Sequence, residues 1–173
     1  MNKLPVVGVM GSGSDPHDDA AMPLGKLLAA LGVHLLTGGG GGVMRSVSGA
    51  FVRERRRAGL CLGVLPGEVD GAGWAAPGGY PNEFVEIVIR THLPGRGKEG
   101  GAKDSRNWIN VLSSDAVIIL PGGDGTECEA RIARELGKPA ISFGGVAAPE
   151  GIAPALTLSE VERFLRIELK LGR

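Results

Sequence analysis

The chain of 173 residues has 19 basic and 19 acidic side chains and therefore no net charge at neutral pH. Proteins that bind nucleic acid or acidic membranes through charge need a basic excess, so neither partner is expected. The sequence has two cysteines without a CxxC spacing and no apolar run long enough to cross a bilayer. These features predict a cytoplasmic protein without a disulfide, and the length fits one domain spanning residues 1–173.

The N-terminal part of the chain alternates short apolar runs with segments of helical periodicity. These predict strands at 4–10, 33–37 and 60–65 and helices at 18–31 and 43–57. Gly32 follows the first helix as an expected C-cap. A basic cluster at the end of the second helix is interpreted as a solvent-exposed helix face, and it comprises Arg53, Arg55, Arg56 and Arg57, with Glu54 among them.

The C-terminal part continues the pattern after a Gly- and Pro-rich segment, 67–82, that we expect to be a loop. The further expected elements are strands at 84–91, 115–120 and 139–143 and helices at 105–114, 126–136 and 159–170. The polar segment 94–104 is the best candidate for a mobile surface loop. Strands that are apolar on both faces and alternate with helices predict an α/β fold, a Rossmann-like open parallel sheet with helices on both faces.

Glycine is the anomaly of the composition, with 30 residues in 173. The glycines gather at the ends of apolar runs, and three Gly-rich turns, at 11–14, 38–42 and 122–126, each lead into a predicted helix. Ligands of open parallel sheets bind beyond the carboxyl ends of the strands, and helix N-termini attract phosphate. The turns therefore predict a site for a small molecule that bears a phosphate, although neither a Walker A motif nor a complete GxGxxG is present.

The third Gly-rich turn carries the residues with the clearest chemistry. In PGGDGTECE, Thr126 is expected at the N-cap and Glu129 follows three residues later. This spacing fits a capping box, and it also fits a glutamate that acts as an acid, a base or an acceptor for a ribose hydroxyl. The carboxylates of Asp124, Glu127 and Glu129 would repel a phosphate, so a cation is needed, and Arg106 is the best candidate. Arg96, Lys98 and Lys103 of the polar segment are further cations, although we expect that segment to be a disordered loop.

These segments resemble the LOG-like proteins, which are often mislabelled as lysine decarboxylases. Residues 121–129 match the PGGxGTxxE motif of that family, and residues 38–44, GGGGGVM, are similar to its other Gly-rich loop. In the family an arginine 23 positions before the motif's glutamate shares the active site, and Arg106 stands 23 positions before Glu129. The resemblance runs from residue 4 to about residue 145.

The resemblance implies a Rossmann-like fold, a homodimer or homotetramer and, in the enzymatic branch, a phosphoribohydrolase. That reaction splits a nucleoside 5′-monophosphate into a base and ribose 5-phosphate. The catalytic residues would be Arg106, which orients the phosphoribosyl group, and Glu129, which acts in acid/base chemistry or stabilises an oxocarbenium ion. No lysine stands out as a Schiff-base anchor for pyridoxal phosphate, and the three histidines lack a metal-binding spacing.

The pair Arg106-Asn107 departs from the enzymatic branch, which usually has Arg-Lys. Residues 79–97 and 105–115 look more like molybdenum-cofactor carrier proteins, which bind a pterin phosphate without needing to cleave it. We therefore expect a carrier of the molybdenum cofactor or a related pterin or nucleotide, with hydrolysis of a nucleoside monophosphate as the alternative. The residues expected to hold the ligand are Gly11, Ser12, Gly13, Gly39, Gly40, Gly41, Gly42, Met44, Arg106, Asn107, Gly122, Gly123, Gly125 and Thr126.

Overall fold

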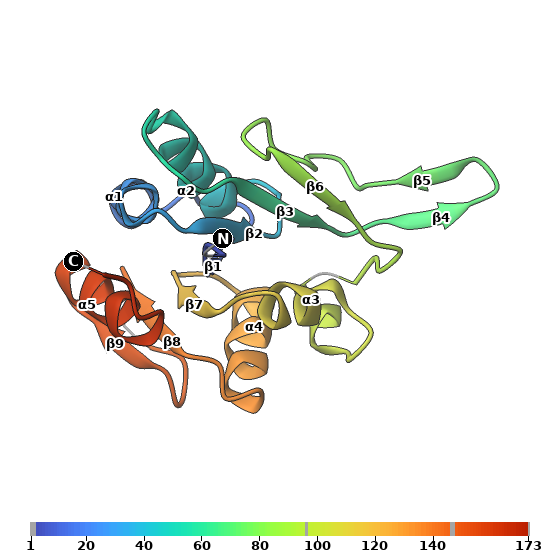
Figure 1. Ribbon diagram of the computed structural model, residues 1–173. Coiled ribbons are helices and arrows are strands. Elements are labelled where there is room, and N and C mark those ends of the chain that lie inside the picture. Colours follow the sequence, from blue (N-terminus) through green and yellow to red (C-terminus); the bar gives the residue numbers. More distant parts are fainter. Residues whose placement is uncertain (1–2, 96, 146–147, 173) are drawn as a thin grey trace.

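The centre of the molecule is a seven-stranded sheet in which every pairing is parallel (Figure 1). The computed structural model describes residues 3–95, 97–145 and 148–172. In spatial order the strands are β6 (Ile87–Arg90), β3 (Cys61–Leu65), β2 (His34–Thr37), β1 (Val6–Met10), β7 (Ala116–Ile119), β8 (Ala140–Phe143) and β9 (Ala153–Ala155). This arrangement confirms the predicted Rossmann-like parallel α/β fold.

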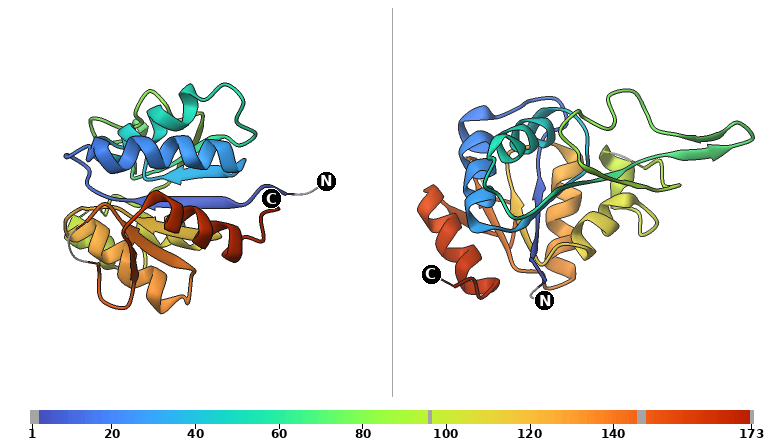
Figure 2. Two further views of the ribbon diagram at one scale, coloured as in Figure 1. Left: turned by 90° about the vertical axis from the view of Figure 1, so that its left-hand side faces the viewer. Right: turned by 45° about the horizontal axis from the view of Figure 1, so that its top comes forward.

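Helices cover both faces of the sheet (Figure 2). One face packs against α1 (Asp18–Leu31), α2 (Gly42–Arg53) and α5 (Leu158–Glu168), and the other packs against α3 (Arg106–Leu112) and α4 (Asp124–Glu135). The central strands serve both layers, since Val7 and Val9 of β1 face the first layer and Met10 faces the second. Aliphatic side chains therefore build two cores, one on each side of a buried sheet.

The order of the strands reverses between β1 and β7. From β1 the chain builds outward through β2, β3 and β6, then crosses to β7 on the other side of β1 and builds outward again. Val7 of β1 shows the register with both neighbouring strands, because it pairs with Leu35 of β2 on one side and with Ala116 of β7 on the other. The loops after β1 and β7 consequently diverge, and this is the point at which such sheets open a ligand crevice.

Three strands lie where the sequence predicted none. The segment expected to be a loop, 67–82, contains an antiparallel hairpin of β4 (Glu68–Asp70) and β5 (Gly73–Ala75), which projects from the body of the molecule (Figure 1). The indole Nε1 of Trp74 fixes its base by donating to the carbonyl oxygen of Thr91 at 2.7 Å. The strand β9 was also missed, since it has only three residues and one of them is proline.

Three further predictions were wrong for local reasons: two helix boundaries and one expected loop. The helix predicted at 43–57 ends at Arg53, because the backbone of Glu54 is extended. The residues from Arg55 to Arg57 therefore do not lie on the exposed helix face that was expected. Arg57 instead forms an ion pair with Glu86. The segment 94–104 is not a disordered loop throughout, since it contains a 3-10 helix, η1 (Gly97–Gly101), that packs against α4. Arg96 lies outside the described residues. The helix predicted at 126–136 begins two residues earlier, at Asp124.

Two other expectations agree with the structure. Gly32 is the C-cap of α1 and has a left-handed backbone, with φ of 71°. Both cysteines are free, and burial raises the pKa of the Cys61 thiol to about 11.

Within residues 3–95, 97–145 and 148–172, no helix is both long and apolar enough to cross a membrane.

A substitution at Gly25 tests the close packing of α1 on α2. A Cβ atom at this position would lie 2.5 Å from the carbonyl oxygen of Val47, so Gly25→Ala should lower the free energy of unfolding by about 1–3 kcal/mol. This loss exceeds the gain in helix propensity of about 1 kcal/mol. Gly71→Ala, in the hairpin turn with nothing within 4 Å of the new atom, is the matched control and should be nearly neutral. Urea denaturation of both variants provides the measurement, and equal stabilities would contradict the proposed packing.

Candidate functional site

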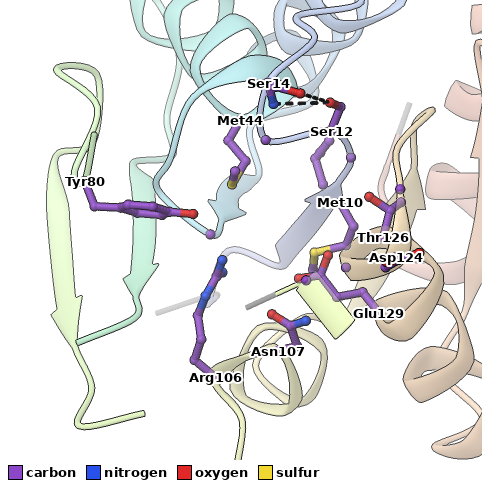
Figure 3. A pocket seen from close by; sticks show the side chains of 17 residues that line it. Met10, Ser12, Ser14, Met44, Tyr80, Arg106, Asn107, Asp124, Thr126 and Glu129 are labelled. Carbon is purple, nitrogen blue, oxygen red and sulfur yellow. Dashed lines mark hydrogen bonds between the residues drawn. The ribbon is translucent and has the colours of Figure 1, made fainter. Parts of the chain in front are cut away.

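A cleft with a volume of about 390 Å³ lies at the carboxyl ends of β1 and β7 (Figure 3). The loop after β1, the loop after β2 and the start of α4 form its walls, together with the N-terminal part of α3. The residues that line it are Val9, Met10, Gly11, Ser12, Gly13, Ser14, Gly38, Met44, Tyr80, Gly97, Arg106, Asn107, Gly123, Asp124, Gly125, Thr126 and Glu129. The cleft therefore forms at the reversal of strand order.

The structure brings most of the predicted site residues to this cleft. Those that line it are Gly11, Ser12, Gly13, Met44, Arg106, Asn107, Gly123, Gly125, Thr126 and Glu129. The others do not line it: Gly39, Gly40 and Gly41 are absent from its lining, and Gly42 and Gly122 each line another cavity, of about 380 Å³ and 280 Å³. Three Gly-rich turns thus converge on one edge of the sheet; the first lines the cleft with both of its glycines, and the other two with only part of theirs.

The run of glycines after β2 serves close packing inside the protein. A Cβ atom at Gly38 would overlap the guanidinium group of Arg106. Asn82 fixes the run from outside, because its backbone N–H donates to the carbonyl oxygen of Gly39 at 2.8 Å and its Nδ2 donates to that of Gly40 at 2.9 Å. The backbone N–H of Gly39 is also used, since it donates to Oγ1 of Thr37 at 3.1 Å. Gly38, the first residue of the run, consequently leaves room for the guanidinium of Arg106.

Arg106 is a buried cation that reaches into the cleft from the first turn of α3 (Figure 3). Its side chain lies beside Gly38, and its Cζ atom lies 5.9 Å from the ring centroid of Tyr80. Among the described residues, its Nε and Nη1 atoms have no hydrogen-bond partner although both are buried. A buried guanidinium without acceptors carries a large desolvation cost, which an anion in the cleft would offset.

The first turn of α4 forms the wall opposite the Gly38 loop. Gly123 is the N-cap, so Thr126 is the third residue of the helix and its N–H donates to the carbonyl oxygen of Gly123 at 2.9 Å. The capping-box interpretation of Thr126 and Glu129 was therefore wrong, because the helix begins before Thr126. Residues 123–126 line the cleft, so the partial positive charge of the helix end favours an anion there.

Glu129 lies one turn further along α4 and also lines the cleft. It is 7% exposed, and its Oε1 accepts a hydrogen bond of 2.9 Å from Nδ2 of Asn110. Burial raises the pKa of this carboxyl group above its ordinary value, while Arg106 and the hydrogen bond from Asn110 act in the opposite direction. Because burial is the largest of these effects, ionised Glu129 costs free energy in the folded protein.

The other two acidic residues of the third turn do not oppose an anion directly. The carboxylate of Asp124 lies 3.8 Å from Nζ of Lys98 on η1, which offsets part of its charge. Glu127 lines the cavity of about 280 Å³ and not the cleft. Of the three carboxylates expected to repel a phosphate, Glu129 therefore remains the main source of repulsion, and Arg106 opposes its charge.

Sequence reasoning missed several residues that line the cleft. Among them, Gly38 was the first glycine of a run whose later members attracted attention, and Met10 ends an apolar strand like any core residue. Tyr80 lies in the segment that was expected to be a loop, and it reaches the cleft from the return of the hairpin. The signal that was available for Gly38 and Met10 is their place at the carboxyl ends of β2 and β1, where ligands of such sheets bind.

The comparison with known families agrees with this geometry. A family model described as the SLOG cluster4 family matches residues 4–164. The chain belongs to this family. An uncharacterized protein of Archaeoglobus fulgidus is 34% identical over 165 residues, which cover 94% of this chain and 95% of that protein.

Two solved structures have similar folds and informative names. The molybdenum cofactor binding protein of Rippkaea orientalis is 32% identical with a TM-score of 0.62, and the match covers 99% of this chain and 88% of that one. The Moco carrier protein of Chlamydomonas reinhardtii is 27% identical with a TM-score of 0.73, covering 97% of this chain and 99% of that one.

The burial of Glu129 predicts a pH-dependent difference between the protein and its Glu129→Gln variant. A pKa that is higher in the folded than in the unfolded chain means that the folded protein binds more protons between the two values. The stability of the parent protein relative to the variant should therefore be greatest below about pH 4, near the unfolded pKa, and should fall as pH rises through the folded pKa. Urea denaturation from pH 4 to 8 measures the difference, and a constant difference would contradict a raised pKa.

Within the described residues, Nε and Nη1 of Arg106 have no acceptor, which predicts that the residue lowers the stability of the ligand-free protein. Replacing a buried charge by an apolar side chain of similar volume commonly raises stability by about 1–4 kcal/mol. We expect Arg106→Met to raise the free energy of unfolding of the ligand-free protein by about 1 kcal/mol or more. Chemical denaturation in a buffer without phosphate or sulfate is the measurement. A marked loss of stability would show that Arg106 is satisfied within the protein.

Proposed function

We propose that this protein binds the molybdenum cofactor, or a related phosphorylated pterin, in the cleft and carries it without cleaving it. The observation that carries the proposal is the buried guanidinium of Arg106, which lines the cleft and whose buried Nε and Nη1 atoms lack an acceptor among the described residues. A guanidinium in this state favours a phosphate in the cleft, because charge-assisted hydrogen bonds to an anion are stronger than those between neutral groups.

The walls of the cleft supply the rest of a phosphate site. The start of α4 lines the same space with residues 123–125, and the positive end of a helix favours an anion. Gly11 and Gly13 also line the space and have no side chain. The backbone N–H of Ser12 is already bound to the carbonyl oxygen of Pro121 at 2.9 Å, which ties the two turns together. The phosphate is therefore expected between Arg106 and the start of α4.

The remaining surface of the cleft suits a flat heterocycle. The ring of Tyr80 and the thioethers of Met10 and Met44 line the cleft beside its polar groups (Figure 3). Aromatic rings and polarisable sulfur atoms pack well against planar rings, and most ligand pockets combine such apolar walls with a few polar groups. The names of the two similar structures support a pterin that carries molybdenum as the ligand.

Retention of the ligand is proposed in preference to hydrolysis on two grounds. Asn107 lines the cleft where the enzymatic branch of the LOG-like proteins usually has lysine, so that cation is missing beside Arg106. The two similar structures are described as a binding protein and a carrier protein, and neither name refers to a hydrolase. Hydrolysis would be detected as adenine released from AMP, which the proposal does not expect.

Binding of molybdenum cofactor freshly released from a molybdoenzyme tests the proposed function. The cofactor should bind saturably and should survive longer in the bound state, and Arg106→Met should weaken binding by roughly tenfold to a hundredfold, because hydrogen bonds to charged groups are lost. The matched control is Arg163→Met, which removes an arginine of α5 on the far face of the sheet and should leave the affinity unchanged.

Mass spectrometry of the ligand that co-purifies with the protein provides an independent check. A molybdopterin species would support the proposal. Absence of saturable cofactor binding, or turnover of AMP that is lost in Glu129→Gln, would contradict it.

A further inference from the structure

Asn110 is a completely buried polar residue of α3 that the proposed function has not used. Its Nδ2 donates to Oε1 of Glu129 at 2.9 Å, and its own Oδ1 is buried without a hydrogen-bond partner among the described residues. An unsatisfied buried carbonyl oxygen costs free energy, so a residue placed here only for stability would be a poor choice. The contact with Glu129 is the one side-chain hydrogen bond that the described structure gives to Asn110.

The position of Asn110 is fixed from its own helix. The backbone carbonyl oxygen of Asn110 accepts a hydrogen bond of 2.8 Å from Oγ of Ser114, which lies just beyond the end of α3. Lys138 closes the same end, because its Nζ donates to the carbonyl oxygens of Leu112 at 2.9 Å and Ser114 at 2.7 Å. The side-chain amide is therefore held against Glu129 and is enclosed away from water.

The contact leaves the two oxygens of Glu129 in different states. Oε1 is held by Asn110, while Oε2 has no protein donor among the residues that the structure describes. The charged groups that share the cleft are Arg106 from α3 and Asp124 from the start of α4, and Lys98 of η1 lies beside Asp124. No ion pair joins Arg106 to Glu129 within 4 Å in the described part of the chain, so the carboxylate lines the cleft with one oxygen unused.

We propose that Asn110 is a positioning residue that determines ligand specificity: by holding Oε1 of Glu129, it presents Oε2 to the cleft as a hydrogen-bond acceptor. The inference rests on the proposed function and adds a second requirement to it. The ionised form of Glu129, which Arg106 and the hydrogen bond from Asn110 favour against the effect of burial, accepts hydrogen bonds and cannot donate them. The ligand then needs an anionic group for Arg106 and an N–H or O–H donor for Glu129. A pterin ring has N–H and amino donors, whereas sulfate has the anionic charge alone.

The test compares Asn110→Leu with the parent protein in two measurements. In the ligand-free protein, a carbon-13 NMR titration of the Glu129 carboxyl group should show a higher pKa in the variant, because the donor to the carboxylate is gone. At pH 7 the affinity for molybdenum cofactor should fall roughly tenfold, the value of a hydrogen bond to a charged group, while the affinity for sulfate stays within about twofold. Glu129→Gln identifies the resonance and should lose the same cofactor affinity.

Asn110→Asp provides a second variant of the parent size, and it should also raise the pKa of Glu129 because two carboxyl groups then share one space. An unchanged pKa of Glu129 in both variants would overturn the inference, even if the parent protein binds the cofactor. Equal losses for sulfate and cofactor would also overturn it, because they would mean that the substitution displaces α3 and with it Arg106. Failure of the parent protein to bind cofactor contradicts the proposed function, and the titration still decides the contact between Asn110 and Glu129.

Discussion

The site depends on one arginine that the protein buries without satisfying. Arg106 lies between the backbone of Gly38 and the ring of Tyr80, and two of its nitrogen atoms have no acceptor in the described structure. A folded chain tolerates such a group only when the rest of the fold is stable enough to bear its cost. Here the two aliphatic cores on either side of the sheet supply that stability. An anion bound in the cleft would provide the hydrogen-bond acceptors that Arg106 lacks.

The topology explains why this arginine lies opposite the start of α4. The reversal of strand order places β1 beside β7, so the turns that follow these strands separate and leave a space between them. The helix α3 crosses back from the outer strand β6 to reach β7, which brings its first turn to the same edge. Arg106 and Glu129, 23 residues apart in the sequence, thereby reach one cleft from two neighbouring helices on the same face of the sheet.

The parts of the fold that were predictable from the sequence are those controlled by local pattern. The apolar runs of β1, β2, β3 and β7 could be recognised because strands buried on both faces need continuous aliphatic residues. The hairpin β4–β5 could not, because its glycines and exposed positions look like a loop, and its base is fixed by a distant contact of Trp74. The start of α4 was misplaced because Thr126 is a good capping residue, whereas the chain already turns at Gly123.

The candidate site was predictable to a similar extent. The Gly-rich turns and the pair of Arg106 and Glu129 pointed to the cleft, but the partners that control them did not stand out. Asn110 has the appearance of an ordinary polar residue in an amphipathic helix, and only the packing of α3 against α4 shows that it contacts Glu129. Tyr80 could be assigned to the cleft only once the path of the chain after the hairpin was known, and the sequence did not predict that path. Contacts between distant elements therefore account for what pattern alone left out.

The close approach of Gly38 to Arg106 has a consequence for how such sequences diverge. A side chain at position 38 would displace the guanidinium from its present position, so the glycine is favoured for as long as the arginine occupies that position. A descendant that replaced the arginine with a small residue would be released from that requirement and would leave a hole for a larger side chain to fill. The two positions should therefore covary among relatives, and a chain with a bulky residue at position 38 is expected to have given up the anion site altogether.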